Sequence, residues 1–201
     1  MIRCLLFIAF LLPQIAFAQD FPARFSVTGV AADDTLNIRA EPNSKSQILG
    51  ELSPFAINIE VLELSKDSKW GMIGTGEGNG WVFMRFLAEN TPQDPHSLPR
   101  PFKCSGTEPF WTLAMTVRGA EFQEPGLPRE DLNEGYEGVA NAGYLAIFDQ
   151  GPYISYTLMA ERAVCGDGMS DRKFGFAARL FVETPDGNRY MRGCCTMDQS
   201  R

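Results

Sequence analysis

The sequence predicts an all-β protein made of two small modules. Short apolar runs alternate with clusters of turn residues along nearly the whole chain, which is the pattern that strands leave in a sequence. The segment Asn90 to Pro101 interrupts this pattern: it holds four prolines among polar residues, as an extended, semi-rigid linker would. We therefore expect one module over residues 24–89, a linker over 90–101 and a second module over 102–197.

The first residues have the features of a secretory leader. Arg3 precedes an apolar run from Cys4 to Leu12, and Ala16-Phe17-Ala18 matches a signal-peptidase site. The run is shorter than the roughly 20 residues that cross a bilayer, which disfavours the alternative of an uncleaved anchor. Gln19, rather than the cysteine that a lipoprotein needs, follows the expected cut. The sequence predicts a signal peptide over 1–18 and a mature protein that does not span the membrane and is periplasmic or secreted.

The charge balance argues against nucleic acid as a partner. The chain has a net charge of -7, and removal of the leader takes away Arg3 and makes it -8. A protein that neutralises phosphates needs a basic face, and no Lys/Arg cluster occurs in the sequence. About 180 residues remain after cleavage, enough for two cores of modest size.

The first module contains one clear alternating strand. Ile57, Ile59 and Val61 should lie on one face, with Asn58 and Glu60 on the other. The glycine-rich segment from Gly74 to Gly80 lacks the lysine and the following helix of a phosphate-binding loop, so we interpret it as a hairpin tip.

Several motifs of this module have a distinctive order and spacing. They are Leu36-Asn37-Ile38-Arg39, Pro42, Ser46, Gly50-Glu51-Leu52, Ile57 to Leu62, Trp70, Gly80-Trp81-Val82 and Phe86-Leu87. This set resembles the bacterial SH3 (SH3b) family over roughly Phe25 to Glu89. Pro42 and Asn43 suit the turn after the first motif, Gly80 would allow a tight turn before Trp81, and Pro54-Phe55-Ala56 departs from the glycine turn usual in the family. The resemblance implies a small five-stranded barrel that binds cell-wall peptides or protein partners.

Two tryptophans are the ligand-binding candidates of this module. Trp70 and Trp81 could stack on a ligand, since aromatic rings offer a large rigid area at low entropic cost. The alternative is that both pack in the core.

The second module also reads as strands. Its apolar runs are rich in aromatic and β-branched residues and cover Trp111 to Val117, Tyr144 to Phe148, Tyr153 to Met159 and Phe174 to Val182. Pro128 to Tyr136 is the one helical candidate, because proline suits the first helical position, although Gly135 interrupts it and a loop is the alternative.

Three sequence blocks of this module are distinctive. They are Cys104-Ser105-Gly106-Thr107-Glu108-Pro109-Phe110-Trp111, Cys165-Gly166-Asp167-Gly168-Met169-Ser170 and Gly193-Cys194-Cys195. Together they resemble an uncharacterised family of bacterial envelope proteins and lipoproteins. The resemblance implies an envelope location and a small antiparallel barrel, loosely lipocalin-like, with no activity attached.

Four cysteines remain after the leader, and export places them in an oxidising compartment where two disulfides are expected. A bond between Cys194 and Cys195 is disfavoured, because neighbouring Cα atoms lie about 3.8 Å apart and unstrained bridges span roughly 4.4 to 6.8 Å. Cys104 and Cys165 should thus each take one member of the doublet, in an order left open. The alternation of Met191, Cys195 and Met197 with polar neighbours places Cys195 inward.

Metal and thiol chemistry are the alternatives for these cysteines. Four cysteines could bind zinc, but adjacent ligands in a strand point apart. A thiol catalyst would need a basic partner, and the only histidine, His96, lies in the linker. We expect no cofactor and no metal.

Glu108, Phe110 and Trp111 could line a pocket with an acidic and an aromatic wall. The alternative is that Pro109 begins a strand and Trp111 packs in the core. Oxygen ligands from Glu108, Asp167 and Asp171 lack the regular spacing of a calcium loop. The turn chemistry of Gly166-Asp167-Gly168 accounts for Asp167 instead.

The leading hypothesis is a non-enzymatic cell-envelope protein whose first module binds a peptidoglycan-derived, peptide or protein ligand. One alternative is a small cell-wall hydrolase with Glu108 and Asp167 as acid and base. Another is a protein resembling lysozyme inhibitors, in which a rigid barrel inserts a loop into its target.

Overall fold

The computed structural model describes residues 21–91, 97–140 and 143–197. The expected leader, His96 and the first half of the linker prolines lie outside the described residues. The all-β prediction is confirmed: two separate sheets form the fold, and the only helical element described is the short 3-10 turn η1 (Met84–Phe86). The described part of the chain contains no helix with the length and apolar character needed to cross a bilayer.

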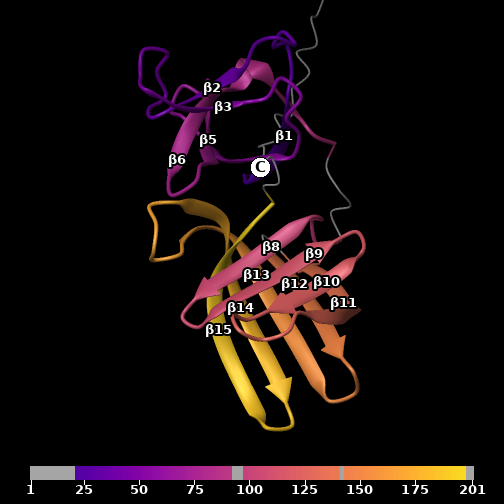
Figure 1. Cartoon of the computed structure of the whole chain (residues 1–201). Coiled ribbons are helices and arrows are strands. Elements are labelled where there is room, and N and C mark those ends of the chain that lie inside the picture. The colour runs from indigo at the N-terminus through magenta and orange to yellow at the C-terminus, as the bar shows by residue number, and fades with distance from the viewer. Residues whose placement is uncertain (1–20, 92–96, 141–142, 198–201) are drawn as a thin grey trace, which may run out of the picture.

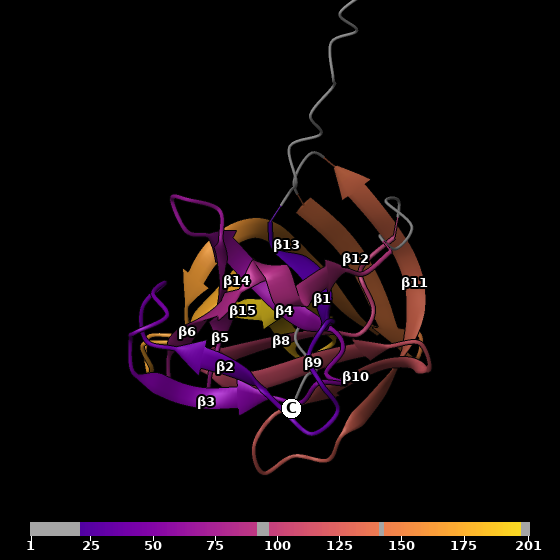
Figure 2. The same cartoon turned by 90° about the horizontal axis from the view of Figure 1, so that it is seen from above.

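The N-terminal module is one antiparallel sheet of seven strands in the order β3-β2-β6-β5-β4-β1-β7, in place of the five-stranded barrel that the SH3 resemblance implied. Its strands are β1 (Ala23–Val27), β2 (Leu36–Arg39), β3 (Ile48–Leu52), β4 (Ile59–Leu64), β5 (Trp70–Gly74), β6 (Asn79–Phe83) and β7 (Leu87–Glu89). The sheet encloses a core of nine buried apolar side chains, among them Ile38, Ile73 and Val82 from three adjacent strands. The module lies over one end of the C-terminal module (Figures 1 and 2).

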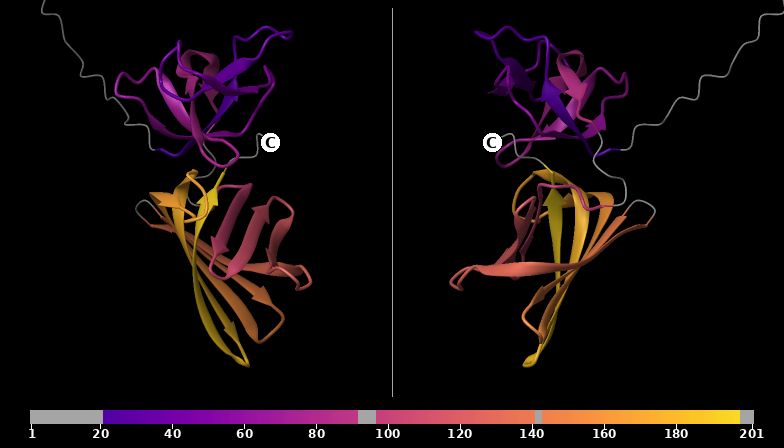
Figure 3. Two further views of the ribbon diagram at one scale, coloured as in Figure 1. Left: turned by 60° about the vertical axis from the view of Figure 1, so that its left-hand side comes forward. Right: turned by 90° about the vertical axis from the view of Figure 1, so that its right-hand side faces the viewer.

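The C-terminal module is a closed antiparallel barrel of eight strands, as expected. Each strand pairs with the next one in sequence, and β15 closes the ring on β8. The strands are β8 (Phe102–Thr107), β9 (Phe110–Thr116), β10 (Gly119–Gln123), β11 (Glu130–Ala140), β12 (Gly143–Gln150), β13 (Ile154–Gly166), β14 (Lys173–Thr184) and β15 (Gly187–Thr196). The long hairpins of β12 to β15 extend away from the N-terminal module (Figure 3).

Side chains fill the barrel interior. Phe102, Phe122, Phe148 and Phe176 are fully buried within it, and the ring of Phe102 meets that of Phe176 edge to face at 5.0 Å. An eight-stranded barrel is just wide enough for side chains to fill.

Three expectations for local structure are wrong. Pro128 to Tyr136 is not helical: most of it belongs to β11, where a register shift between Glu134 and Tyr136 absorbs Gly135 as a bulge and Leu132 is buried in the barrel core. Pairing with β12 outweighs the weak helical signal of a proline.

The alternation from Ile57 to Val61 holds for only part of that segment. Asn58 has a positive φ of 56°, so β4 begins at Ile59 and Ile57 lies exposed before it. Glu60, expected on the solvent face, is buried because that face of β4 meets the barrel. Gly80 was expected to form a tight turn before Trp81, but it lies within β6. Its Cα packs closely on Ile38, and a Cβ at this position would come within 2.4 Å of Ile38 Cγ2.

Both disulfides are formed, and their pairing resolves the alternative that the sequence left open. Cys104 is bonded to Cys195, and Cys165 to Cys194. Cys104 and Cys195 are directly opposite each other on the strands that close the barrel and are fully buried, with Cys195 inward. Cys165 is partly exposed, so one bridge is internal and the other lies nearer the surface.

The two bridges should differ in their accessibility to reductants. Thiol exchange requires a thiolate to reach a sulfur atom, so limited reduction with dithiothreitol followed by alkylation should label Cys165 and Cys194 before Cys104 and Cys195. Peptide mapping would measure the order of labelling, and earlier labelling of Cys104 would contradict the assignment of the Cys104–Cys195 bridge as the internal one.

The internal bridge also restricts the unfolded chain, because it joins residues 91 positions apart. In the chain-entropy model its contribution to stability is about 4 to 5 kcal/mol.

A buried carboxylate joins the two modules. Glu60 on β4 is only 4% exposed, and it accepts hydrogen bonds from Thr196 Oγ1 at 2.5 Å and from the Met197 backbone N–H at 3.0 Å, at the end of β15. Its cross-strand neighbour Arg24 is also partly buried, and its guanidinium donates to the carbonyl oxygens of Arg100 and Pro101. Burial lowers the pKa of Arg24, and the charge of Glu60 opposes that shift.

Further contacts surround this pair. Arg162 of the barrel donates to the Pro22 carbonyl at 2.8 Å, and the Lys173 N–H donates to Asn79 Oδ1 at 2.8 Å. Gly175 fits closely beneath the N-terminal module, because a Cβ there would lie 2.5 Å from the Pro22 ring. The modules therefore meet through a close, polar interface.

The end of the linker belongs to the barrel rather than to solvent. Leu98 is buried in the barrel core, and its N–H donates to Glu137 Oε2 at 3.2 Å. Arg100 forms ion pairs with Glu134, at 2.8 Å, and with Glu137. The linker is thus anchored before the first barrel strand begins.

Replacing Glu60 should loosen the junction. Glu60→Ala leaves Thr196 Oγ1 and the buried Met197 N–H without this acceptor, and each such loss costs about 1–3 kcal/mol. Calorimetry should show a lowered or split unfolding transition. Glu63→Ala, on the same strand but exposed, is the matched control and should change little. Equal effects of the two substitutions would refute the role given to Glu60.

Candidate functional site

A groove with a volume of about 880 Å³ lies in the N-terminal module. Its walls come from the loop before β2, from β2 and the turn after it, from the β4–β5 hairpin, and from the end of β6 with η1. Its lining comprises Gly29, Val30, Ala31, Asp34, Thr35, Leu36, Asn37, Arg39, Pro42, Asn43, Ser44, Asp67, Lys69, Trp70, Phe83 and Phe86.

Aromatic rings contribute the apolar part of this groove. Trp70 and Phe83 are cross-strand partners on β5 and β6, with ring centroids 5.1 Å apart, and Phe86 of η1 lies 6.2 Å from Phe83. Trp70 is buried, and the two phenylalanines are half-buried. The pleat places Phe83 and Trp70 on the same face of the sheet, whereas Val82 and Ile73 face the core. These rings form a rigid surface on which a ligand could stack.

Charges of both signs line the groove. Asp67 Oδ1 accepts hydrogen bonds from Ser65 Oγ at 2.6 Å and from the Lys69 N–H at 3.2 Å, and Lys69 Nζ lies 3.7 Å from its other oxygen. The hydrogen bond from Ser65 is the main cause of a lowered pKa of Asp67. Asp34 accepts from the Thr35 N–H at 2.8 Å.

The basic side of the groove includes a fixed guanidinium. Arg39 Nη1 donates to the Ser46 carbonyl oxygen at 2.7 Å, which holds the side chain in the turn after β2. That turn is formed as expected, since Asn43 Oδ1 accepts from the Lys45 N–H. Arg39 therefore supplies a positioned positive charge at the end of β2.

The two tryptophan candidates have different positions. Trp70 contributes to the groove, while Trp81 is half-buried and is not among its lining residues. Trp81 is a cross-strand partner of Met72 and of Arg39. The sequence did not single out Asp67, Lys69 or Phe83, because only the folded hairpin brings them beside Trp70.

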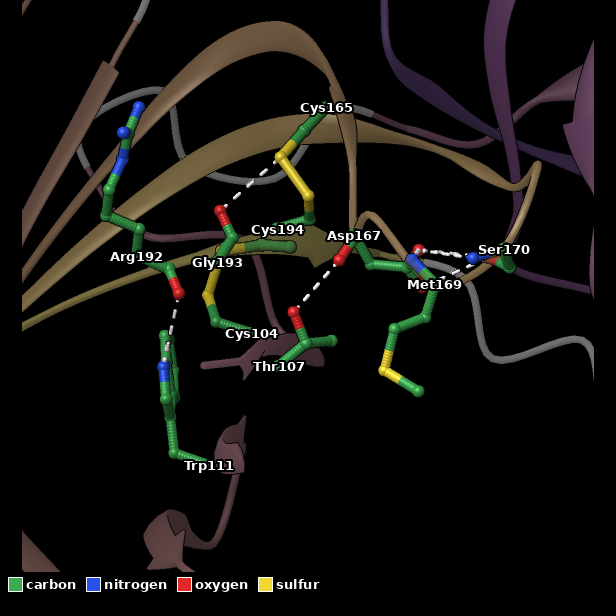
Figure 4. Close-up of a disulfide and its surroundings, with 11 residues drawn as sticks. Cys104, Thr107, Trp111, Cys165, Asp167, Met169, Ser170, Arg192, Gly193 and Cys194 are labelled. Atoms are coloured by element: carbon green, nitrogen blue, oxygen red, sulfur yellow. Dashed lines mark hydrogen bonds between the residues drawn. A yellow bond between two sulfur atoms is a disulfide. The ribbon is translucent and has the colours of Figure 1, made fainter. Parts of the chain in front are cut away.

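The candidates of the second module do not gather into one pocket. Glu108 and Phe110 are exposed at the β8–β9 hairpin, and Trp111 is buried in the barrel core. Figure 4 shows Trp111 with its indole N–H directed at the Arg192 carbonyl oxygen, at 3.3 Å. Trp111 therefore packs in the core, as the alternative interpretation expected.

Two glycines make room for this tryptophan. A Cβ on Gly106 would lie 2.1 Å from Trp111 Nε1 and 2.5 Å from the Arg192 carbonyl oxygen. A Cβ on Gly193 would lie 2.1 Å from the Ser105 carbonyl oxygen and 2.8 Å from the Trp111 ring. The first and third sequence blocks thus have a shared structural purpose: their glycines allow β8 and β15 to approach the indole.

The second block forms a braced turn beside the outer disulfide (Figure 4). Asp167 Oδ1 accepts from the backbone N–H groups of Met169 and Ser170 at 3.0 and 2.9 Å, and Thr107 Oγ1 donates to the Asp167 carbonyl oxygen at 2.9 Å. The bond from the Ser170 N–H is the main cause of the lowered pKa of Asp167. Its carboxylate serves as a turn cap, in agreement with the turn interpretation.

Within the described ranges, no group of three or more His, Cys, Asp or Glu side chains is arranged to hold a metal ion. Comparison of the chain with protein-family models, with curated proteins and with solved structures gave no match.

Substitution of Gly106 tests the packing of Trp111. Gly106→Ala should destabilise the barrel by about 1–3 kcal/mol or more, because the new methyl group meets a rigid carbonyl as well as the indole. Denaturant titration followed by tryptophan fluorescence would measure it. Gly166→Ala is the control, since a Cβ at Gly166 has no atom within 4 Å. A Gly106→Ala protein as stable as this control would disprove the packing argument.

Proposed function

We propose that this chain is a non-enzymatic exported protein of the cell envelope, and that the groove of its N-terminal module binds a peptide. The ligand is an extended peptide segment, either derived from peptidoglycan or belonging to an envelope protein. The observation that carries the proposal is the groove itself, with Trp70, Phe83 and Phe86 between charged rims. The SH3-like motifs of this module point to the same class of ligand.

The volume and composition of the groove support a peptide. About 880 Å³ is within the range of sites that hold ligands of several residues. The lining of the groove carries Asp34 and Asp67 as well as Lys69 and Arg39, which suits a ligand with both amino and carboxylate groups. Wall peptides carry both groups.

The location rests on the sulfur chemistry. Two disulfides suit an oxidising compartment. Together with the expected leader, they support a periplasmic or secreted protein. The barrel would then act as a stable base for the N-terminal module, since its interior is filled by side chains.

Retention on purified peptidoglycan sacculi tests the proposal. The full chain should co-sediment with sacculi, and Lys69→Ala should weaken retention about threefold to tenfold, a loss of about 0.7–1.4 kcal/mol that corresponds to one exposed charged contact. Lys66→Ala is the matched control, because Lys66 is exposed on the same hairpin and does not line the groove.

A double substitution in the groove strengthens the test of peptide binding. Asp67→Asn with Lys69→Ala should reduce retention further while circular dichroism stays unchanged, since both side chains are exposed. Absence of retention of the wild-type protein on sacculi and on their soluble peptides would refute the wall ligand. Release of soluble fragments during incubation would instead favour the hydrolase alternative.

A further inference from the structure

Strand β3 is an open edge of the N-terminal sheet. Among the described residues it pairs only with β2, and Figure 2 shows it at the outer border of the module with no strand beyond it. An open edge presents a row of backbone N–H and C=O groups with the spacing of a strand. Such a row is complementary to another extended chain.

The edge lacks most of the features that prevent pairing. Exposed edges are commonly protected by lysine, proline or inward charges, whereas β3 reads Ile-Leu-Gly-Glu-Leu and has Glu51 as its single charge. Ile48 and Leu49 are each 47% exposed. One protective feature is present: Ile38 pairs with Gly50 and Arg39 with Ile48, so Leu49 is a bulge on the β2 side.

Apolar surface continues beside this edge. A hollow of about 330 Å³ borders β3, with Ile38 and Leu52 in its lining and the tip of the β5–β6 hairpin at its far side. Phe55, at its rim, is 73% exposed, and Ile57 nearby is 60% exposed. Exposed apolar residues gathered at one place commonly mark a protein interface.

The sequence of β3 is complementary to itself. In antiparallel pairing about a two-fold axis at Gly50, Ile48 faces Leu52 of the other copy and Leu49 faces its Glu51. This is the register that pairs all five residues, and it keeps the two Glu51 carboxylates from facing each other. Two-fold contacts between copies are the commonest mode of self-association.

We propose that two copies of this chain associate through β3, joining their N-terminal sheets into one antiparallel sheet across a two-fold axis at Gly50. The peptide groove is formed by other segments, so both grooves stay open in the pair. The proposal does not depend on the ligand of the groove. The partner that we propose for the apolar β3 edge is a second copy of this chain.

Engineered cysteines test the register, in a full chain with Cys4→Ser so that the leader contributes no thiol. Residues directly opposite in an antiparallel pair have Cα atoms about 4.5–5.5 Å apart, which suits a disulfide. Gly50→Cys should therefore form a covalent dimer with itself on mild oxidation. Glu51→Cys should not, because two Glu51 Cα atoms would be more than about 8 Å apart.

A mixture provides the complementary result. Leu49→Cys mixed with Glu51→Cys should cross-link into a heterodimer, which non-reducing gels of differently tagged chains would detect. Equal cross-linking of Glu51→Cys alone and of Gly50→Cys would overturn the register.

Sedimentation equilibrium tests the association itself. The apparent mass of the wild-type chain should rise toward twice the monomer mass with concentration, and Leu49→Lys should raise the dissociation constant at least about tenfold, a loss of about 1.4 kcal/mol. Val117→Lys is the control, since Val117 is 86% exposed at the β9–β10 turn. A monomer at every attainable concentration, or a dimer equally affected by both substitutions, would show the proposal to be wrong.

Discussion

The buried carboxylate of Glu60 is the constraint on which the arrangement of the two modules depends. A charged group with so little contact to water is stable only when nearby donors compensate for its lost hydration. The donors are Thr196, the last residue of the final barrel strand, and Met197, which follows it, and Arg24 lies opposite Glu60 on the neighbouring strand. Folding of the barrel thus completes the solvation of a residue in the other module, which couples two cores that have no apolar cluster in common.

Within the barrel, a comparable role belongs to the place where β8, β9 and β15 meet. There Trp111 lies across two glycines, and the Cys104–Cys195 bridge joins the strands on either side of the closure. The three sequence blocks converge at this place, with the turn around Asp167 braced against Thr107. Close packing and covalent closure account for most of the residues that made these blocks distinctive, and Glu108 and Phe110 are left as surface positions.

Strand periodicity and turn chemistry were sufficient to predict the all-β class and the aromatic strands of the barrel, because both depend on local sequence. They were not sufficient for Glu60, whose burial depends on a surface supplied by a distant part of the chain. The bulge at Gly135 shows the same limit, since pairing with β12 decided the conformation of that segment. In the groove, Trp70 was recognisable, but the positions of Asp67 and Lys69 beside it depend on how the β4–β5 hairpin folds back.

Closure of the barrel has a consequence for its topology as a polymer. Because Cys104 and Cys195 are bonded, the chain between them forms a covalent ring, and the two cysteines are 91 residues apart in the sequence. This ring contains the turns that connect the barrel strands from β8 to β15. A protease that cuts one of those turns opens one ring without releasing a fragment, and the Cys165–Cys194 bridge still closes a second ring within the segment. The same geometry would let new chain ends be introduced at such a turn, as in circular permutation, while every strand stays attached to its neighbours.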